Sequence, residues 1–183
     1  MNKKLKWIIA VVLAVLLMVG VYFLYGYLTK EYDADDNVSS SASDVTLYDA
    51  PDFVVYDVNG NEVTLSDYFG KPIVLNFWAT WCYYCKVEMP DFNEAYKNYP
   101  DVQFLMVNAT GTNGETVESA KAYVEQEKYE FPVLFDTMYE ANQAYRLSSF
   151  PMTVFIDADG NVISSRVGML TKEALEEEIA KLL

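Results

Sequence analysis

The chain has no histidine and only two cysteines among its 183 residues. Without histidine it has neither a Ser-His nor a Cys-His catalytic pair. The same absence removes histidine ligands from any zinc or copper site, and two cysteines alone are too few for a four-ligand zinc centre within one chain. Several common classes of hydrolase and metalloprotein are therefore excluded before any motif is considered.

Basic residues are also scarce, because 13 Lys and Arg face 27 Asp and Glu and give a net charge of −14. Four of the basic residues lie within the first 30 positions, and every acidic residue follows them. Affinity for nucleic acids depends on Lys and Arg that neutralise phosphates. We therefore expect no nucleic-acid partner.

Charge is missing altogether from residues 7–28, an apolar stretch that follows Lys3, Lys4 and Lys6. As a helix, this stretch is long enough to cross a bilayer core of about 30 Å. The lysines favour a cytoplasmic N-terminus. A cleaved signal peptide is the alternative, although its apolar region usually has about 7 to 15 residues. We predict that residues 1–28 form a cytoplasmic N-terminus and one transmembrane anchor, with the rest of the chain outside.

The remaining chain divides by composition into a linker and a folded domain. Residues 29–48 are acidic and rich in serine, without apolar periodicity, which predicts a flexible linker. In residues 49–183, runs typical of strands alternate with segments of helical periodicity, and two turns that contain glycine predict hairpins. We expect an α/β domain with a central mixed β-sheet flanked by helices and an N-terminal β-hairpin. The expected strands are 53–56, 62–65, 73–78, 102–108, 133–135, 153–156 and 162–167, and the expected helices are one from the cysteines onward, 115–127, 138–146 and one from about residue 171.

The two cysteines, Cys82 and Cys85, form a Cys-x-x-Cys motif between an expected strand and an expected helix. A purely structural crosslink over so short a loop would stabilise little, and a metal site would need a second chain to supply ligands. A redox pair fits the strand-to-helix position best. Cys82 at the helix N-terminus would be the nucleophile, because the helix dipole stabilises its thiolate. Cys85, one turn further, would resolve the mixed disulfide.

Glu88 lies three residues after Cys85 on the expected helix, on or beside the face that carries Met89 and Phe92. A carboxylate buried there would have a raised pKa and could accept a proton from Cys85. An ordinary helix glutamate that reaches solvent is the alternative. Helical spacing alone does not separate the two.

The segment FWATWCYYCKVEMP, residues 77–90, resembles the active-site segment of membrane-anchored, extracytoplasmic thioredoxin-like proteins of the bacterial TlpA/ResA type. The resemblance extends over residues 49–183 in the order of elements and implies a thioredoxin-like fold. It implies that Cys82 and Cys85 are the redox pair and that Glu88 is the buried acid that tunes them. It also implies substrate contacts by Trp81, Tyr83, Tyr84, Phe150 and Pro151.

Pro151 in the segment SFPMT resembles the cis-proline that packs against the disulfide in this family. Taken by itself, the dipeptide favours a trans bond that opens a strand, because cis is the minority state of X-Pro bonds. The resemblance therefore implies a cis Phe150–Pro151 bond, whereas the dipeptide alone favours a trans bond.

Several positions depart from related families. Asn76 replaces the buried Asp of ordinary thioredoxins, so acid-base work would fall on Glu88, and Tyr83-Tyr84 replaces the usual dipeptide between the cysteines, which leaves the direction of electron flow open. Leu75 and Ala79 occupy the places of the Pro and Thr or Ser that peroxiredoxins need, so a peroxidase is excluded. A Sco-like copper carrier would need Cys-x-x-x-Cys and a distal histidine.

These features together predict a thiol-disulfide oxidoreductase on the outer face of a bacterial cytoplasmic membrane, single-pass and monomeric, without cofactor or metal. The resemblance implies that it reduces disulfides of exported proteins, with apocytochrome c or a methionine sulfoxide reductase as candidate clients. Because that compartment is oxidising, electrons would come from a membrane protein of the CcdA/DsbD type. The alternatives are an oxidase that forms disulfides and a thioredoxin-like module that binds clients or a metal without turnover.

Overall fold

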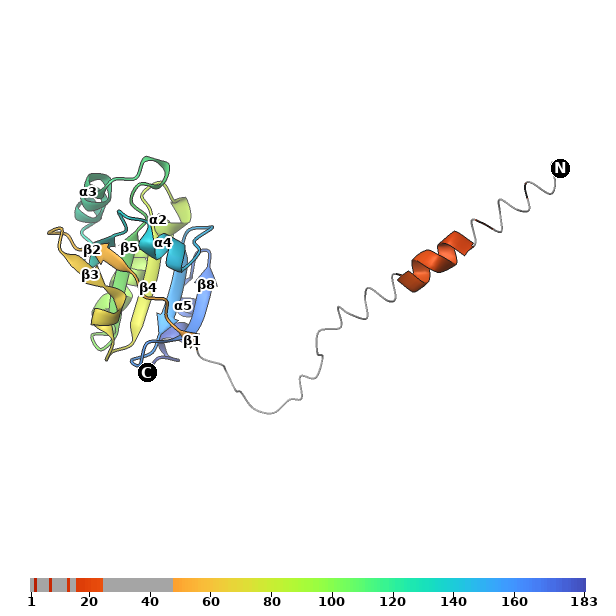
Figure 1. Cartoon of the computed structure of the whole chain (residues 1–183). Helices are drawn as coiled ribbons and strands as arrows, with labels where there is room; N and C mark the ends of the chain where they lie inside the picture. The colour runs from red at the N-terminus through yellow and green to blue at the C-terminus, as the bar shows by residue number, and fades with distance from the viewer. Residues whose placement is uncertain (1, 3–6, 8–12, 14–15, 25–47) are drawn as a thin grey trace. The chain divides into compact units, whose positions relative to one another are not determined.

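The computed structural model describes residues 2, 7, 13, 16–24 and 48–183 (Figure 1). The chain divides into two compact units, Met1–Val45 and Thr46–Leu183. In the first unit, residues 16–24 are helical. Among the described residues, no helix combines the length and apolar character needed to cross a membrane. Most of the predicted anchor, residues 7–28, and nearly all of the predicted linker, residues 29–48, lie outside the described residues.

The second unit is built on a single sheet with the strand order β1-β8-β7-β4-β5-β6-β2-β3. The parallel strands β4, β5 and β6 form its middle, and β7 runs antiparallel to β4. A hairpin of β2 and β3 closes one side, and β8 and β1 close the other. The predicted mixed sheet and N-terminal hairpin are thereby confirmed. The strands are β1 (Tyr48–Asp49), β2 (Val54–Tyr56), β3 (Glu62–Thr64), β4 (Ile73–Trp78), β5 (Gln103–Asn108), β6 (Val133–Phe135), β7 (Met152–Ile156) and β8 (Asn161–Val167).

Helices lie on both faces of this sheet (Figure 1). One apolar cluster joins the sheet to α2, α3 and α5, and a second cluster joins its other face to α4, the η1 turn and the N-terminal hairpin. The helical elements are η1 (Leu65–Tyr68), α2 (Tyr83–Asn98), η2 (Thr112–Gly114), α3 (Val117–Glu127), α4 (Glu140–Ala144) and α5 (Lys172–Ile179). All four expected helices are present, with ends that differ by a few residues.

The central strand β4 contributes side chains to both apolar clusters, one on each face of the sheet. Its residues are all buried, and alternate side chains enter different clusters: Val74 and Trp78 enter the cluster of α2, whereas Leu75 and Phe77 enter the opposite one. Because side chains alternate across a strand, Asn76 faces the α2 layer. A polar side chain is thus placed beneath the helix that carries both cysteines.

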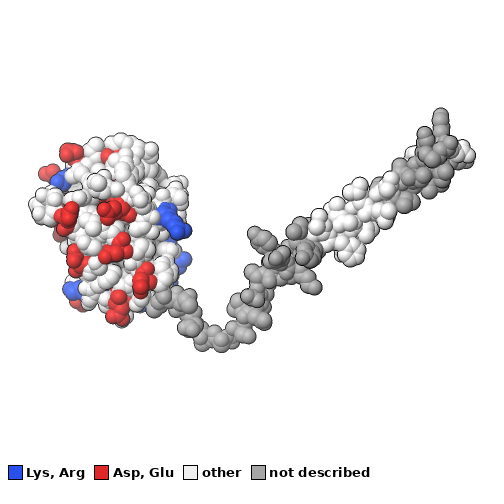
Figure 2. Space-filling view, in the orientation of Figure 1, with Lys and Arg blue, Asp and Glu red and all other residues white. Residues whose placement is uncertain are grey.

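The surface of the second unit is acidic on the face seen in Figure 2. Asp and Glu side chains are spread over this face, whereas Lys and Arg lie mostly near its margins. The excess of acidic groups agrees with the sequence, in which 27 Asp and Glu but only 9 of the 13 Lys and Arg lie after residue 30. Such a surface provides a negative potential around the domain.

Candidate active site

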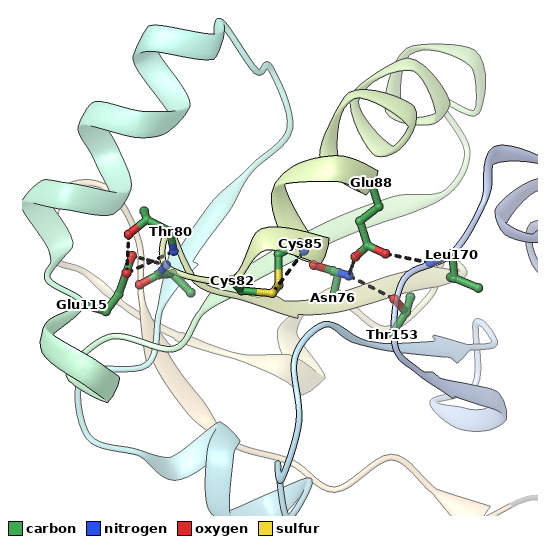
Figure 3. The surroundings of a disulfide bond; sticks show 9 residues. Asn76, Thr80, Cys82, Cys85, Glu88, Glu115, Thr153 and Leu170 are labelled. Carbon is green, nitrogen blue, oxygen red and sulfur yellow. Dashed lines mark hydrogen bonds between the residues drawn. A yellow bond between two sulfur atoms is a disulfide. The ribbon is translucent and has the colours of Figure 1, made fainter.

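The two cysteines are joined by a disulfide at the point where β4 gives way to α2 (Figure 3). The bond has an S–S distance of 2.11 Å and joins Cα atoms 5.3 Å apart. Cys82 is the N-cap of α2, and its Sγ accepts a hydrogen bond of 3.1 Å from the backbone N–H of Cys85. An N–H group of the first helical turn therefore points at the sulfur that would carry negative charge after reduction.

The two cysteines differ slightly in exposure, since Cys82 is 5% exposed and Cys85 is completely buried. Nucleophilic exchange requires a thiolate that a partner disulfide can reach. Of the pair, only Cys82 has exposed surface, which agrees with the expectation that it is the nucleophile.

Aromatic side chains surround the disulfide on the surface. Tyr83 and Tyr84 lie on the exposed first turn of α2 and meet edge to face, with ring centroids 5.4 Å apart. Trp81 meets Phe150 in the same manner at 5.6 Å and is itself 41% exposed. The structure thus brings two of the expected substrate-contact residues together and leaves the tyrosine pair open to solvent.

The Phe150–Pro151 peptide bond is cis. The expectation from the resemblance is therefore met, and the expectation of a trans bond from the dipeptide alone is wrong. Statistics for isolated X-Pro bonds describe a local preference, whereas Pro151 is buried just before β7 and its carbonyl accepts a hydrogen bond of 2.8 Å from the backbone N–H of Gly168. The surroundings of the buried proline, and not the dipeptide, determine the isomer.

Glu88 is 1% exposed and lies on the buried face of α2, as the first of the two sequence interpretations expects. One carboxylate oxygen accepts a hydrogen bond of 2.9 Å from Asn76 Nδ2, and the other accepts one of 2.9 Å from the backbone N–H of Leu170. Burial raises the pKa of Glu88 to about 7, although these two hydrogen bonds lower it, and the charge of Asp91 adds to the rise. The carboxyl can thus gain and lose a proton near neutral pH.

A second buried carboxylate, Glu115, binds the segment that connects β4 to α2. It is 4% exposed and accepts hydrogen bonds from Thr80, one from the backbone N–H at 3.1 Å and one from Oγ1 at 2.6 Å (Figure 3). Asn108 Nδ2 donates a third, at 3.0 Å. The segment just before Cys82 is thereby fixed by a residue that is distant in sequence.

Sequence reasoning missed several of these contacts. The sequence pattern places Glu115 at the start of a helix, whereas α3 begins at Val117 with Thr116 as its N-cap, so Glu115 ends the preceding loop. Nothing in the local pattern distinguishes it from other acidic residues. Thr153, which accepts a hydrogen bond from Asn76, and the backbone N–H of Leu170 lie far from Glu88 in sequence. In the described part of the chain, no group of His, Cys, Asp and Glu is arranged to hold a metal ion.

Comparison with known proteins agrees with this geometry. Residues 47–165 match the AhpC/TSA family. The chain is 35% identical over 184 residues to the thiol-disulfide oxidoreductase ResA of Bacillus thuringiensis subsp. konkukian, covering 98% of each chain. It is 40% identical to ResA of Geobacillus kaustophilus over 132 residues, which cover 71% of this chain and 74% of that relative.

Solved structures show the same fold. A putative thiol:disulfide interchange protein DsbE from Chlorobium tepidum superposes with a TM-score of 0.65 and 33% identity, over 73% of this chain and 94% of the other. The pneumococcal exposed lipoprotein thioredoxin Etrx1 from Streptococcus pneumoniae superposes with a TM-score of 0.63 and 34% identity, over 72% and 99%. The chain therefore belongs to the AhpC/TSA family and, within it, is a ResA-like thiol-disulfide oxidoreductase with a thioredoxin-like fold.

Proposed function

We propose that the protein works as a disulfide reductase, tethered to the outer face of the cytoplasmic membrane and acting on exported proteins. The chemical groups next to the cysteine pair support this direction of electron transfer, from the protein to its clients. Two tyrosines, and no cation, stand between the cysteines, and the carboxylate of Glu88 is buried on the same helix.

Strong oxidants of this kind stabilise their reduced form by stabilising a thiolate. In this protein the neighbouring acid opposes a buried thiolate, and the acidic surface adds to that effect (Figure 2). The reduced form thus has less stabilisation than in an oxidant. A less stable dithiol gives up its electrons more readily, which favours reduction of clients.

The catalytic cycle would proceed by two exchanges. The Cys82 thiolate attacks one sulfur of a client disulfide, and the leaving client thiolate takes up a proton. Cys85 loses its thiol proton, for which the Glu88 carboxylate is the acceptor in our proposal, and its thiolate attacks Cys82 Sγ. The second client thiolate leaves, the Cys82–Cys85 disulfide forms, and two electrons have passed to the client. Trp81, Phe150, Pro151 and the exposed pair Tyr83 and Tyr84 are the proposed client contacts.

The tether is proposed from residues 7–28 and from two relatives. The similarity to the Bacillus thuringiensis ResA covers 98% of the chain, so it includes most of the N-terminal segment. The pneumococcal relative is described as an exposed lipoprotein. Because an exported reductase works in an oxidising compartment, it needs an electron source, for which a CcdA/DsbD-type membrane protein is our proposal. Apocytochrome c and an exported methionine sulfoxide reductase are the proposed clients.

The first test is the equilibrium reduction potential of the full chain in detergent micelles, titrated against glutathione or dithiothreitol. A value near or below the roughly −270 mV of thioredoxin supports a reductase, whereas a value close to the roughly −120 mV of a strong oxidant reverses the direction. A control with Cys85→Ser has no disulfide to titrate. In cells, the same variant should accumulate client mixed disulfides through Cys82. A chain that only holds clients would show reversible binding without such adducts.

Membrane attachment needs a separate measurement. The full chain should remain in the membrane pellet after alkaline extraction and should be digested by protease added to intact spheroplasts. Release into the supernatant would contradict an integral anchor. Protection from protease would contradict the outward orientation.

A further inference from the structure

Asn76 is a polar residue in the middle of an otherwise apolar central strand, and it is completely buried. Its alternation along β4 places the side chain in the layer of α2, under the helix of Cys85 and Glu88. A buried amide is costly unless its donors and acceptor are all paired. Its position therefore calls for a physical explanation.

Only one end of this amide has partners in the described structure. Nδ2 donates to Glu88 Oε1 at 2.9 Å and to Thr153 Oγ1 at 3.0 Å. Oδ1 is buried and has no hydrogen-bond partner among the described residues. Figure 3 shows the amide between the disulfide and the Glu88 carboxylate, with its oxygen on the side of the cysteines. A buried acceptor without a donor is rare in folded proteins and calls for an explanation, of which a redox or catalytic role is one.

We propose that Asn76 Oδ1 is the acceptor for the Cys85 thiol in the reduced protein. Reduction delivers two electrons and two protons, breaks the Sγ–Sγ bond and converts Cys85 into a buried S–H donor. That donor needs an acceptor inside the fold, and the amide oxygen provides it. A single side chain then joins Cys85 to Glu88, with S–H···Oδ1 at one end and Nδ2–H···Oε1 at the other.

Two consequences follow for the redox equilibrium. In the disulfide state the amide oxygen is unpaired, and in the dithiol state it is paired, so Asn76 favours reduction. It thereby acts against Glu88, whose negative charge disfavours a buried thiolate. Asn76 and Glu88 act on this equilibrium in the same way whether the protein delivers or withdraws electrons in cells.

The test compares the equilibrium constants of full chains with glutathione at pH 6, below the ordinary thiol pKa of about 8.5. Asn76→Leu removes the acceptor at similar volume, and we expect reduction to become about tenfold less favourable, equivalent to about 30 mV. Thr153→Val is the matched control, because it removes the other partner of the same amide but leaves Oδ1 in place. An equal shift in both variants would show a general packing effect and overturn the proposal.

A spectroscopic measurement tests the hydrogen bond directly. The chain has only two cysteines, so Cys82→Ser leaves Cys85 as the single thiol and the only source of a Raman S–H stretching band. We expect that band to move to higher frequency when Asn76→Leu is added and to stay in place when Thr153→Val is added. A band that does not respond to Asn76→Leu would contradict the proposed contact.

Asn76→Asp provides a further check if the leucine variant does not fold. It keeps an oxygen at the same position, so at pH 6 its equilibrium with glutathione should stay closer to the parent chain than that of Asn76→Leu. A shift as large as that expected for leucine would show that the acceptor oxygen does not determine the equilibrium with glutathione. The introduced carboxyl group would face Glu88, with Asp91 nearby. The measurement is made at pH 6 so that ionisation of the thiols contributes little to the difference between the variants.

Discussion

Glu88 on α2 and Glu178 on α5 are the same residue type in nearly the same degree of burial, yet they have opposite acid-base character. Their exposed fractions are 1% and 3%. The pKa of Glu88 is raised to about 7, whereas the pKa of Glu178 is lowered to about 2. Burial alone therefore does not determine whether the pKa of a carboxyl is raised or lowered.

The partners explain the difference. Burial raises the pKa of Glu178 as well, but hydrogen bonds from Lys181, Ser164 and Arg166 outweigh it. Lys181 Nζ lies 2.8 Å from Oε1, Ser164 Oγ lies 2.6 Å from Oε2, and Arg166 binds Oε1 through its guanidinium. Glu88 instead has two neutral donors and, among the described residues, no cation paired with it. Cations keep Glu178 anionic at neutral pH, where it joins β8 to α5, whereas the raised pKa of Glu88 allows it to exchange a proton near pH 7.

The largest expected effect is on exchange with a client disulfide. Glu88→Gln removes the proton acceptor proposed for Cys85, so we expect the rate of resolution to fall about 100-fold, the usual scale of acid-base catalysis. Single-turnover kinetics at pH 7 with a reduced full chain and a model protein disulfide would measure it. Glu178→Gln makes the same chemical change at a distance from the cysteines and should leave the rate nearly unchanged. Equal losses would show that the two carboxyls do not differ in function.

The second effect is on stability between about pH 4.5 and 7. Because the folded pKa of Glu88 is about 7, the folded chain binds more protons than the unfolded chain in this window. Its contribution to the free energy of unfolding should therefore fall by about 3 kcal/mol as the pH rises through the window. Denaturant titrations of the oxidised chain should show this decline in the parent and lack it in Glu88→Gln. Parallel curves would contradict the raised pKa.

The contribution of Glu178 to the free energy of unfolding should change with pH in the opposite direction, and in a lower pH window. Its depressed pKa contributes stability that is present above the ordinary glutamate value and is lost as the pH falls from about 4.5 toward 2. At pH 7, Glu178→Gln should lower the free energy of unfolding by about 1 to 2 kcal/mol, because its charged donors are half exposed. The deficit should shrink in acid and in high salt. A deficit that is independent of both would indicate loss of packing and not of charge.

The smallest effect concerns Glu115, the buried carboxylate that accepts hydrogen bonds from Thr80. Thr80→Val removes the hydroxyl donor but keeps the backbone N–H donor, so we expect a loss of about 1 kcal/mol in the free energy of unfolding. Because Thr80 precedes Cys82 by two residues, the rate of Cys82 attack should fall slightly while the rate of resolution by Cys85 should not. Separate measurement of adduct formation and release would test this. Equal changes in both steps would argue against local positioning of the loop.

Much of the fold could be predicted because the signals are local. The buried strand 73–78, the Cys-x-x-Cys motif and the following helix occupy adjacent stretches of sequence, and each leaves a pattern in residue type or spacing. The hairpins are predicted by the glycine turns at Gly60 and Gly160, both of which have positive φ. Strand β1 escapes prediction because two residues are too few to show alternation.

The sequence by itself determined the redox pair, the order of strands and helices apart from β1, and the burial of one face of α2, since these depend on neighbours along the chain. Only the tertiary structure decided that Leu170 and Asn76 hold Glu88, that Glu115 holds Thr80 and that the bond before Pro151 is cis. It also decided that Arg166 and Lys181 pair with Glu178 and not with Glu88. Those contacts join residues far apart in sequence, and the pKa of a buried group depends on which donors the fold brings to it, for which no local pattern exists.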